Sequence, residues 1–162
     1  MTANRRVCLV FLALVLLATS VWAQDAAKPK SLYLRLGGYD MIAAIVDDFV
    51  PRLGKDPVIA PLVAGMSLDH KKRNRQLVIE LICEAAGGPC VYTGRTMQSA
   101  HVGLGITEEQ FKLAGGHMIE TLDKFKVVDP ERSELMGMIG KLQPDIVDQK
   151  KEQAPAASAN PR

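Results

Sequence analysis

Apolar residues recur at helical spacing through most of this chain, and no segment shows the strict alternation that is typical of a strand. Two stretches, 41–53 and 67–85, each place their apolar side chains on one face of a helix. The first face carries Met41, Ile42, Ile45, Val46, Phe49 and Leu53, and the second carries Asn74, Leu77, Val78, Leu81, Ile82 and Ala85. Glycine pairs at 37–38 and 87–88 are expected to turn the chain at the helix ends. The pattern predicts an all-α fold.

Three further helices are predicted in the second half of the chain. A short one spans about 96–102, and a long one begins after Thr107, because Thr107 and Gln110 have the spacing of a capping box. Asp129-Pro130 supplies an N-cap and a first-turn proline for the last helix, whose apolar residues are Leu135, Met138, Ile139, Leu142 and Ile146. Gly115-Gly116 weakens the long helix by about 1 kcal/mol per glycine, so we expect a second backbone or a ligand to pass close to it.

The first 23 residues have the organisation of a signal peptide. Arg5 and Arg6 precede an apolar run at 7–18, and small residues follow at the positions where signal peptidase cleaves. We therefore expect the mature chain to begin at Gln24 and to be exported, either periplasmic or secreted. An uncleaved membrane anchor is the alternative, although the apolar run is short for a membrane span.

The opposite end, 149–162, lacks apolar periodicity and is predicted to be a disordered tail, which leaves one domain at 31–148. Loss of residues 1–23 removes two of the 20 basic residues and none of the 18 acidic ones, so the mature chain has 18 of each. A neutral chain lacks the positive field that gathers phosphates. We therefore expect no nucleic acid as a partner. Because the apolar run at 7–18 is removed with the signal peptide, we also expect no stable membrane span in the mature chain.

Cys83 and Cys90 remain after export, because Cys8 lies in the signal segment. Two thiols in an oxidising compartment suggest one disulfide. The segment between them contains Gly87 and Gly88 and can turn back far enough to bring the two Cα atoms within bonding reach. Two reduced, buried cysteines are the alternative.

A histidine on the short predicted helix, His101, shares a helix face with Met97. Four sequence strings accompany it, namely Leu32-Tyr33-Leu34-Arg35-Leu36-Gly37-Gly38, Val46-Asp47-Asp48-Phe49, Gly87-Gly88-Pro89-Cys90-Val91-Tyr92-Thr93-Gly94-Arg95 and Ala100-His101-Val102-Gly103-Leu104-Gly105-Ile106-Thr107. On these strings the chain resembles the group 1 truncated haemoglobins, also called two-on-two globins, over about Ser31 to Ile146. The resemblance implies a truncated two-on-two globin sandwich with haem as its cofactor.

By the same resemblance, His101 is the proximal ligand of the haem iron and binds it through a neutral ring nitrogen. The other ring N–H is expected to meet a backbone carbonyl or water. Arg95, or a lysine near Lys71, is expected to meet a propionate. The positions expected to pack on the porphyrin, each of which can equally be ordinary core, are Phe49, Leu81, Ile82, Tyr92, Met97 and Phe111.

The distal side departs from the family pattern. Val50 stands where the family usually has a tyrosine whose hydroxyl donates to the bound gas, and Leu62-Val63 replaces the usual pair of phenylalanines. Counting back from Gly87 places Asn74 and Val78 at two positions that face the iron, where glutamines are common. These departures predict an unusually apolar distal pocket, in which oxygen loses one or two hydrogen bonds of about 1 to 3 kcal/mol each. Carbon monoxide or nitric oxide is then favoured over oxygen.

The function implied is reversible binding of a diatomic gas, oxygen, nitric oxide or carbon monoxide, with an unidentified reductase as a further partner. One alternative is a globin-fold interaction module with weak or no haem, because Val63 removes the aromatic contact that wedges haem in most globins. Another is a haem-dependent nitric oxide dioxygenase or peroxidase, for which no distal acid–base group is evident. His70 is either a sixth iron ligand or an exposed helix-start residue, and His117 is expected to be structural or surface-exposed.

Overall fold

The computed structural model describes residues 29–148, so the predicted signal peptide at 1–23 and the predicted tail at 149–162 lie outside the described residues. The described part contains helices and no strand. Its helices are α2 (Leu32–Leu36), α3 (Gly38–Lys55), α4 (Ala60–Val63), α5 (Leu68–Ala85), α6 (Met97–His101), α7 (Glu108–Lys124), α8 (Glu131–Gly140) and α9 (Gln143–Ile146).

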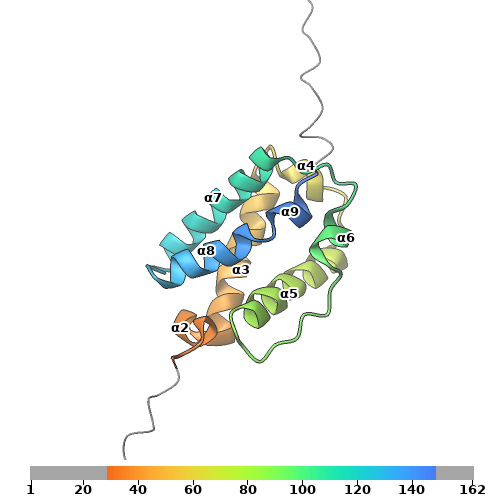
Figure 1. Ribbon diagram of the computed structural model, residues 1–162. Coiled ribbons are helices and arrows are strands. Elements are labelled where there is room, and N and C mark those ends of the chain that lie inside the picture. Colours follow the sequence, from red (N-terminus) through yellow and green to blue (C-terminus); the bar gives the residue numbers. More distant parts are fainter. Residues whose placement is uncertain (1–28, 149–162) are drawn as a thin grey trace, which may run out of the picture.

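The four longest helices form a sandwich of two helices on two (Figure 1). α3 packs against α5, α7 packs against α8, and α7 also lies on α3. The side chains buried where these helices meet are Ile42, Ile45 and Val46 of α3, Ile79 and Cys83 of α5, Met118 and Leu122 of α7, and Leu135 of α8. The all-α prediction is confirmed.

Hydroxyl side chains cap four of the helices at their N-termini. Ser31, Ser67, Thr96 and Thr107 each accept a hydrogen bond from a backbone N–H in the first turn of the helix that follows. At Thr107 the predicted capping box is present, because the Gln110 side chain also accepts from the Thr107 N–H at 3.0 Å. Each such cap stabilises its helix by about 1 kcal/mol.

The prediction of one last helix to Ile146 is wrong, because the chain breaks after Gly140 and resumes as α9. Pro144 lies in the first turn of α9, where its missing N–H and fixed φ are tolerated. A proline inside a helix, like Pro51 of α3, instead removes a backbone hydrogen bond. The start of α8 also differs by one position. Its N-cap is Pro130, and the Asp129 carboxylate accepts from the Ser133 N–H at 3.1 Å.

One smaller expectation is also wrong, and of the two alternatives expected at Gly115-Gly116, a backbone or a ligand, the backbone is not found. On α5 the face that meets the core includes Ile79, which the predicted stripe omitted, whereas Ala85 is exposed. No backbone passes Gly115-Gly116: a Cβ at Gly115 would meet only the end of Met136 at 3.9 Å, and one at Gly116 would meet nothing within 4 Å. Gly115 instead lines the large cavity described below. No helix among residues 29–148 is both long and apolar enough to cross a membrane.

Candidate cofactor-binding site

A cavity of about 1310 Å³ lies among α3, α4, α5, α6 and α7, and residues of α8 and α9 close its end. It is larger than the roughly 300–1,000 Å³ of ordinary small-molecule sites. Every residue that the sequence singled out for the haem pocket lines it: Phe49, Val50, Val63, Asn74, Val78, Leu81, Ile82, Tyr92, Met97, His101 and Phe111. All of them except Ile82 are only half-buried. A wall of half-buried apolar side chains gains stability when an apolar group fills the cavity.

His101 is the last residue of α6, the short helix that the Thr96 cap starts. Its Nδ1 lies 2.8 Å from the carbonyl oxygen of Met97, as expected for a histidine whose second nitrogen binds iron. Because a carbonyl only accepts, Nδ1 must donate, and the neutral ring then carries its lone pair on Nε2. Within the described chain, Nε2 has no hydrogen-bond partner. His101 lines the cavity, and this contact leaves Nε2 as the ring nitrogen whose lone pair is not engaged.

The loop between α5 and α6 carries Tyr92 on the same wall. The Tyr92 hydroxyl donates to the Arg95 carbonyl at 2.7 Å, which folds the loop so tightly that a Cβ at Gly94 would lie 2.2 Å from that hydroxyl. Cys83 of α5 and Cys90 of the loop lie next to each other in the structure with their Cα atoms 5.7 Å apart, which is the spacing of a disulfide. These contacts hold the loop against α5 and so fix the wall beside His101.

Four of the lining residues are those predicted for the distal wall, and three of the four are valines. Val50 comes from α3, Val63 from α4, and Asn74 and Val78 from α5. Asn74 is the one polar residue among these four, and its amide makes no hydrogen bond to the described part of the protein. Its N–H groups are therefore available to a molecule in the cavity.

Basic residues line the outer part of the cavity. His70, Lys71 and Arg95 are exposed and contact it at its edge. Arg75 pairs with Asp47, donating to Oδ2 at 2.7 Å, and this hydrogen bond lowers the pKa of Asp47. Cations at the edge of an apolar cavity suit a ligand that is apolar at its centre and anionic at its margin.

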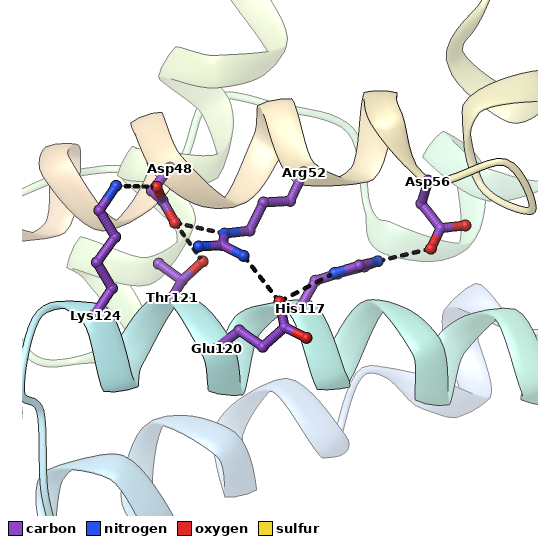
Figure 2. A network of polar contacts seen from close by, with 7 residues as sticks. All are labelled: Asp48, Arg52, Asp56, His117, Glu120, Thr121 and Lys124. Atoms are coloured by element: carbon purple, nitrogen blue, oxygen red, sulfur yellow. Dashed lines mark hydrogen bonds and ion pairs between the residues drawn. The ribbon is translucent and has the colours of Figure 1, made fainter.

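A polar network joins α3 to α7 beside the cavity (Figure 2). Asp48 accepts from Arg52 Nε at 2.6 Å, from Thr121 Oγ1 at 3.1 Å and from Lys124. Hydrogen bonds from Lys124 and then Arg52 lower the pKa of Asp48 to about 2. His117, expected from the sequence to be structural or surface-exposed, is 18% exposed and joins this network through Glu120, whose carboxylate lies 3.8 Å from its Nδ1.

Several cavity residues were not singled out from the sequence. Leu77 faces the cavity from α5, and its position in the predicted apolar stripe was the available signal. Ile59 and Met66 flank α4, a helix that the periodicity did not predict because it has only four residues. Ile146 reaches the cavity only because the chain bends between α8 and α9.

The residues present fit haem. The cavity is large and mainly apolar, and cationic side chains lie at its edge. The imidazole of His101 lines it, with Nδ1 held by the Met97 carbonyl and Nε2 unengaged by the described residues. A two-on-two helical sandwich around such a cavity defines a helical cofactor-binding protein.

Comparisons with known proteins name its family. A model of the bacterial-like globin family matches residues 31–148. The group 1 truncated hemoglobin GlbN of Mycolicibacterium paratuberculosis is 33% identical over 120 residues, which cover 74% of this chain and 86% of that protein. The truncated hemoglobin of Tetrahymena pyriformis in its Fe(III) form has a TM-score of 0.68 at 21% identity and covers 74% of this chain and 100% of its own. A 2/2 hemoglobin from Synechococcus with covalently attached heme has a TM-score of 0.66 at 22% identity, covering 73% of this chain and 98% of its own.

The chain therefore belongs to the bacterial-like globins, as a group 1 truncated haemoglobin. This membership confirms the two-on-two fold and the haem cofactor expected from the sequence. The roles of the individual cavity residues stay predictions.

Proposed function

We propose that the protein holds haem through Nε2 of His101 and reversibly binds a diatomic gas on the opposite, distal side. The observation that carries this proposal is that His101, which lines a large and mainly apolar cavity, has its Nδ1 tied to the Met97 carbonyl and its Nε2 without a hydrogen-bond partner among the described residues. When haem is bound, its iron supplies the site at which the gas binds. Phe49, Tyr92 and Phe111 line the cavity and would pack against the cofactor, and Arg95 or Lys71 would pair with its carboxylates.

The distal wall decides which gas is held well. A bound oxygen molecule carries partial negative charge and gains about 1 to 3 kcal/mol from each donor that reaches it. Val50, Val63 and Val78 offer no donor, and Asn74 offers one amide. We infer that oxygen leaves quickly, and that carbon monoxide and nitric oxide, which need less donor stabilisation, are favoured.

Oxygen dissociation rates, measured by flash photolysis and ligand replacement, test this proposal. Val50→Tyr adds one hydroxyl to the distal wall and is expected to slow oxygen release by about 5- to 100-fold. The matched control Val50→Phe adds the same ring without the hydroxyl and leaves the rate near that of the wild type. Asn74→Ala speeds release several-fold. Slow oxygen release in the wild type that Asn74→Ala leaves unchanged contradicts the proposal.

We also propose that the mature chain is exported and carries the Cys83–Cys90 disulfide. The support is the signal-like first 23 residues together with the bonding distance of the two sulfurs. Mass spectrometry of protein from the periplasm and culture medium is expected to find Gln24 as the first residue and no titratable thiol. A retained N-terminus in the cytoplasmic fraction contradicts export.

A further inference from the structure

The segment that forms one end of the distal wall, residues 57–66, is held by little apolar burial. α4 within it has no buried residue, and Ile59 is the buried side chain of the segment. Leu62, Val63 and Met66 are half-buried and face the cavity. Because burial of apolar side chains is the main source of packing energy, this segment needs other contacts to keep its position.

Asp56 supplies several of those contacts from the C-terminal end of α3. Its Oδ1 accepts from the N–H groups of Val58 at 2.8 Å and Ile59 at 3.1 Å, and its carbonyl accepts from the Ala60 N–H at 2.7 Å. One residue thereby sets the turn that leads from α3 into α4. The placement of the distal wall depends on where this carboxylate is held.

His117 of α7 holds the carboxylate from the other side (Figure 2). Its Nε2 lies 2.8 Å from Asp56 Oδ2, and the two side chains are only 18% and 11% exposed. Since a carboxylate accepts, Nε2 donates, and this hydrogen bond is the largest cause of the lowered pKa of Asp56. Two other charged groups lie beside the ring: Glu120, whose carboxylate is 3.8 Å from Nδ1, and Arg52, which donates to Glu120 at 2.8 Å.

The remaining contact from α7 to this segment is weaker. Gln110 donates to the Val58 carbonyl at 3.3 Å, and Gln110 is also engaged in the capping box with Thr107. Among helix pairs, α4 packs mainly on α3. At 2.8 Å the His117–Asp56 hydrogen bond is the shorter of these two links, and it reaches the segment through the residue that sets its first turn.

We propose that His117 is a positioning residue that acts through Asp56 to hold residues 57–66 against the cavity, and so sets how firmly haem is retained and how readily gas enters. This inference rests on the proposed function, because it assigns the pair a role for haem in the cavity. Haem retention is then set partly by residues outside the cavity, since neither His117 nor Asp56 lines the cavity.

Three variants of the haem-loaded protein test the proposal. His117→Phe keeps a ring and removes the donor. His117→Gln places an amide donor near the position of Nε2 and serves as the conservative rescue. Thr121→Val is the matched control, because it removes another hydrogen bond between α7 and α3, the one to Asp48, without touching Asp56.

The first readout is amide hydrogen exchange at Val58 and Ile59, and the second is haem transfer to excess apomyoglobin. His117→Phe is expected to speed exchange at these two amides by about tenfold or more, the equivalent of one hydrogen bond to a charged group, and to speed haem loss several-fold. His117→Gln restores both rates, and Thr121→Val leaves exchange at Val58 and Ile59 near the wild-type rate.

Equal exchange at Val58 and Ile59 in the His117→Phe and Thr121→Val variants overturns the proposal, as does haem loss that follows global stability alone in all three variants. Failure of the proposed function has a different signature. If haem is not held by His101, its spectrum is insensitive to His101→Ala, whereas exchange at the two amides still reports on the Asp56 contact.

Discussion

Replacing Asp48 by Asn removes the charge at the centre of the α3–α7 network and is expected to destabilise the fold in a pH-dependent way. The native carboxylate accepts from Arg52, Thr121 and Lys124, and its side chain is 14% exposed. Its pKa falls from 3.8 to about 2. Since the native pKa is the lower one, the stabilisation is present above 3.8 and is lost as the pH falls toward about 2.

The expected loss of stability in Asp48→Asn follows from this fall in the pKa of Asp48. A fall of that size corresponds to at most about 2.5 kcal/mol of unfolding free energy at pH 7. Contact with water reduces it to about 1 kcal/mol. Urea unfolding followed by circular dichroism at pH 7 and pH 3 measures it, and the difference between wild type and Asp48→Asn should shrink by about half at pH 3.

Asp40→Asn is the matched control, because Asp40 is an exposed aspartate in the first turn of the same helix. It is expected to change stability by less than about 1 kcal/mol. A loss in Asp48→Asn that is equal at pH 7 and pH 3 refutes the electrostatic reasoning and assigns the effect to packing. A loss no larger than that of Asp40→Asn shows that the network adds nothing to stability.

Three other outcomes are expected. Replacing Cys83 and Cys90 together by Ser lowers the free energy of unfolding by about 2 to 3 kcal/mol in urea denaturation; an unchanged midpoint means that the bond does not form in the purified protein. Val63→Phe slows haem transfer to apomyoglobin by about tenfold or more, through about 2 kcal/mol of added burial, and an unchanged rate removes Val63 from the haem contact. Thr107→Ala costs about 1 kcal/mol of stability and speeds amide exchange at Gln110 first, whereas uniform exchange across the chain contradicts a local cap.

Helix positions were predictable where periodicity and caps coincide. α5 begins after Ser67 and α7 after Thr107, because an apolar stripe and a hydroxyl cap identify the same start. The break between α8 and α9 was missed because Ile139, Leu142 and Ile146 continue one apolar stripe across it. Pro144 was the available signal for the break. An apolar pattern records burial and does not distinguish one helix from two.

The cavity was more predictable than the contacts that brace it. Every residue singled out for haem lines one cavity, because motif strings and helix spacing both constrain the residues around His101. The polar network was not predictable. Asp48 and Arg52 lie four residues apart on one face of α3, and Asp56 follows as its C-cap, but a partner such as His117 lies 61 residues from Asp56 in sequence. Only the packing of α7 on α3 brings them together.

The visible spectrum of the haem-supplied protein, compared between wild type and His101→Ala, tests the central claim most directly. With His101 as the proximal ligand, the wild type shows a strong Soret band. In the variant this band is lost or shifted, and added imidazole restores it by occupying the vacated position. A band of the same position and intensity in both proteins contradicts the assignment of His101.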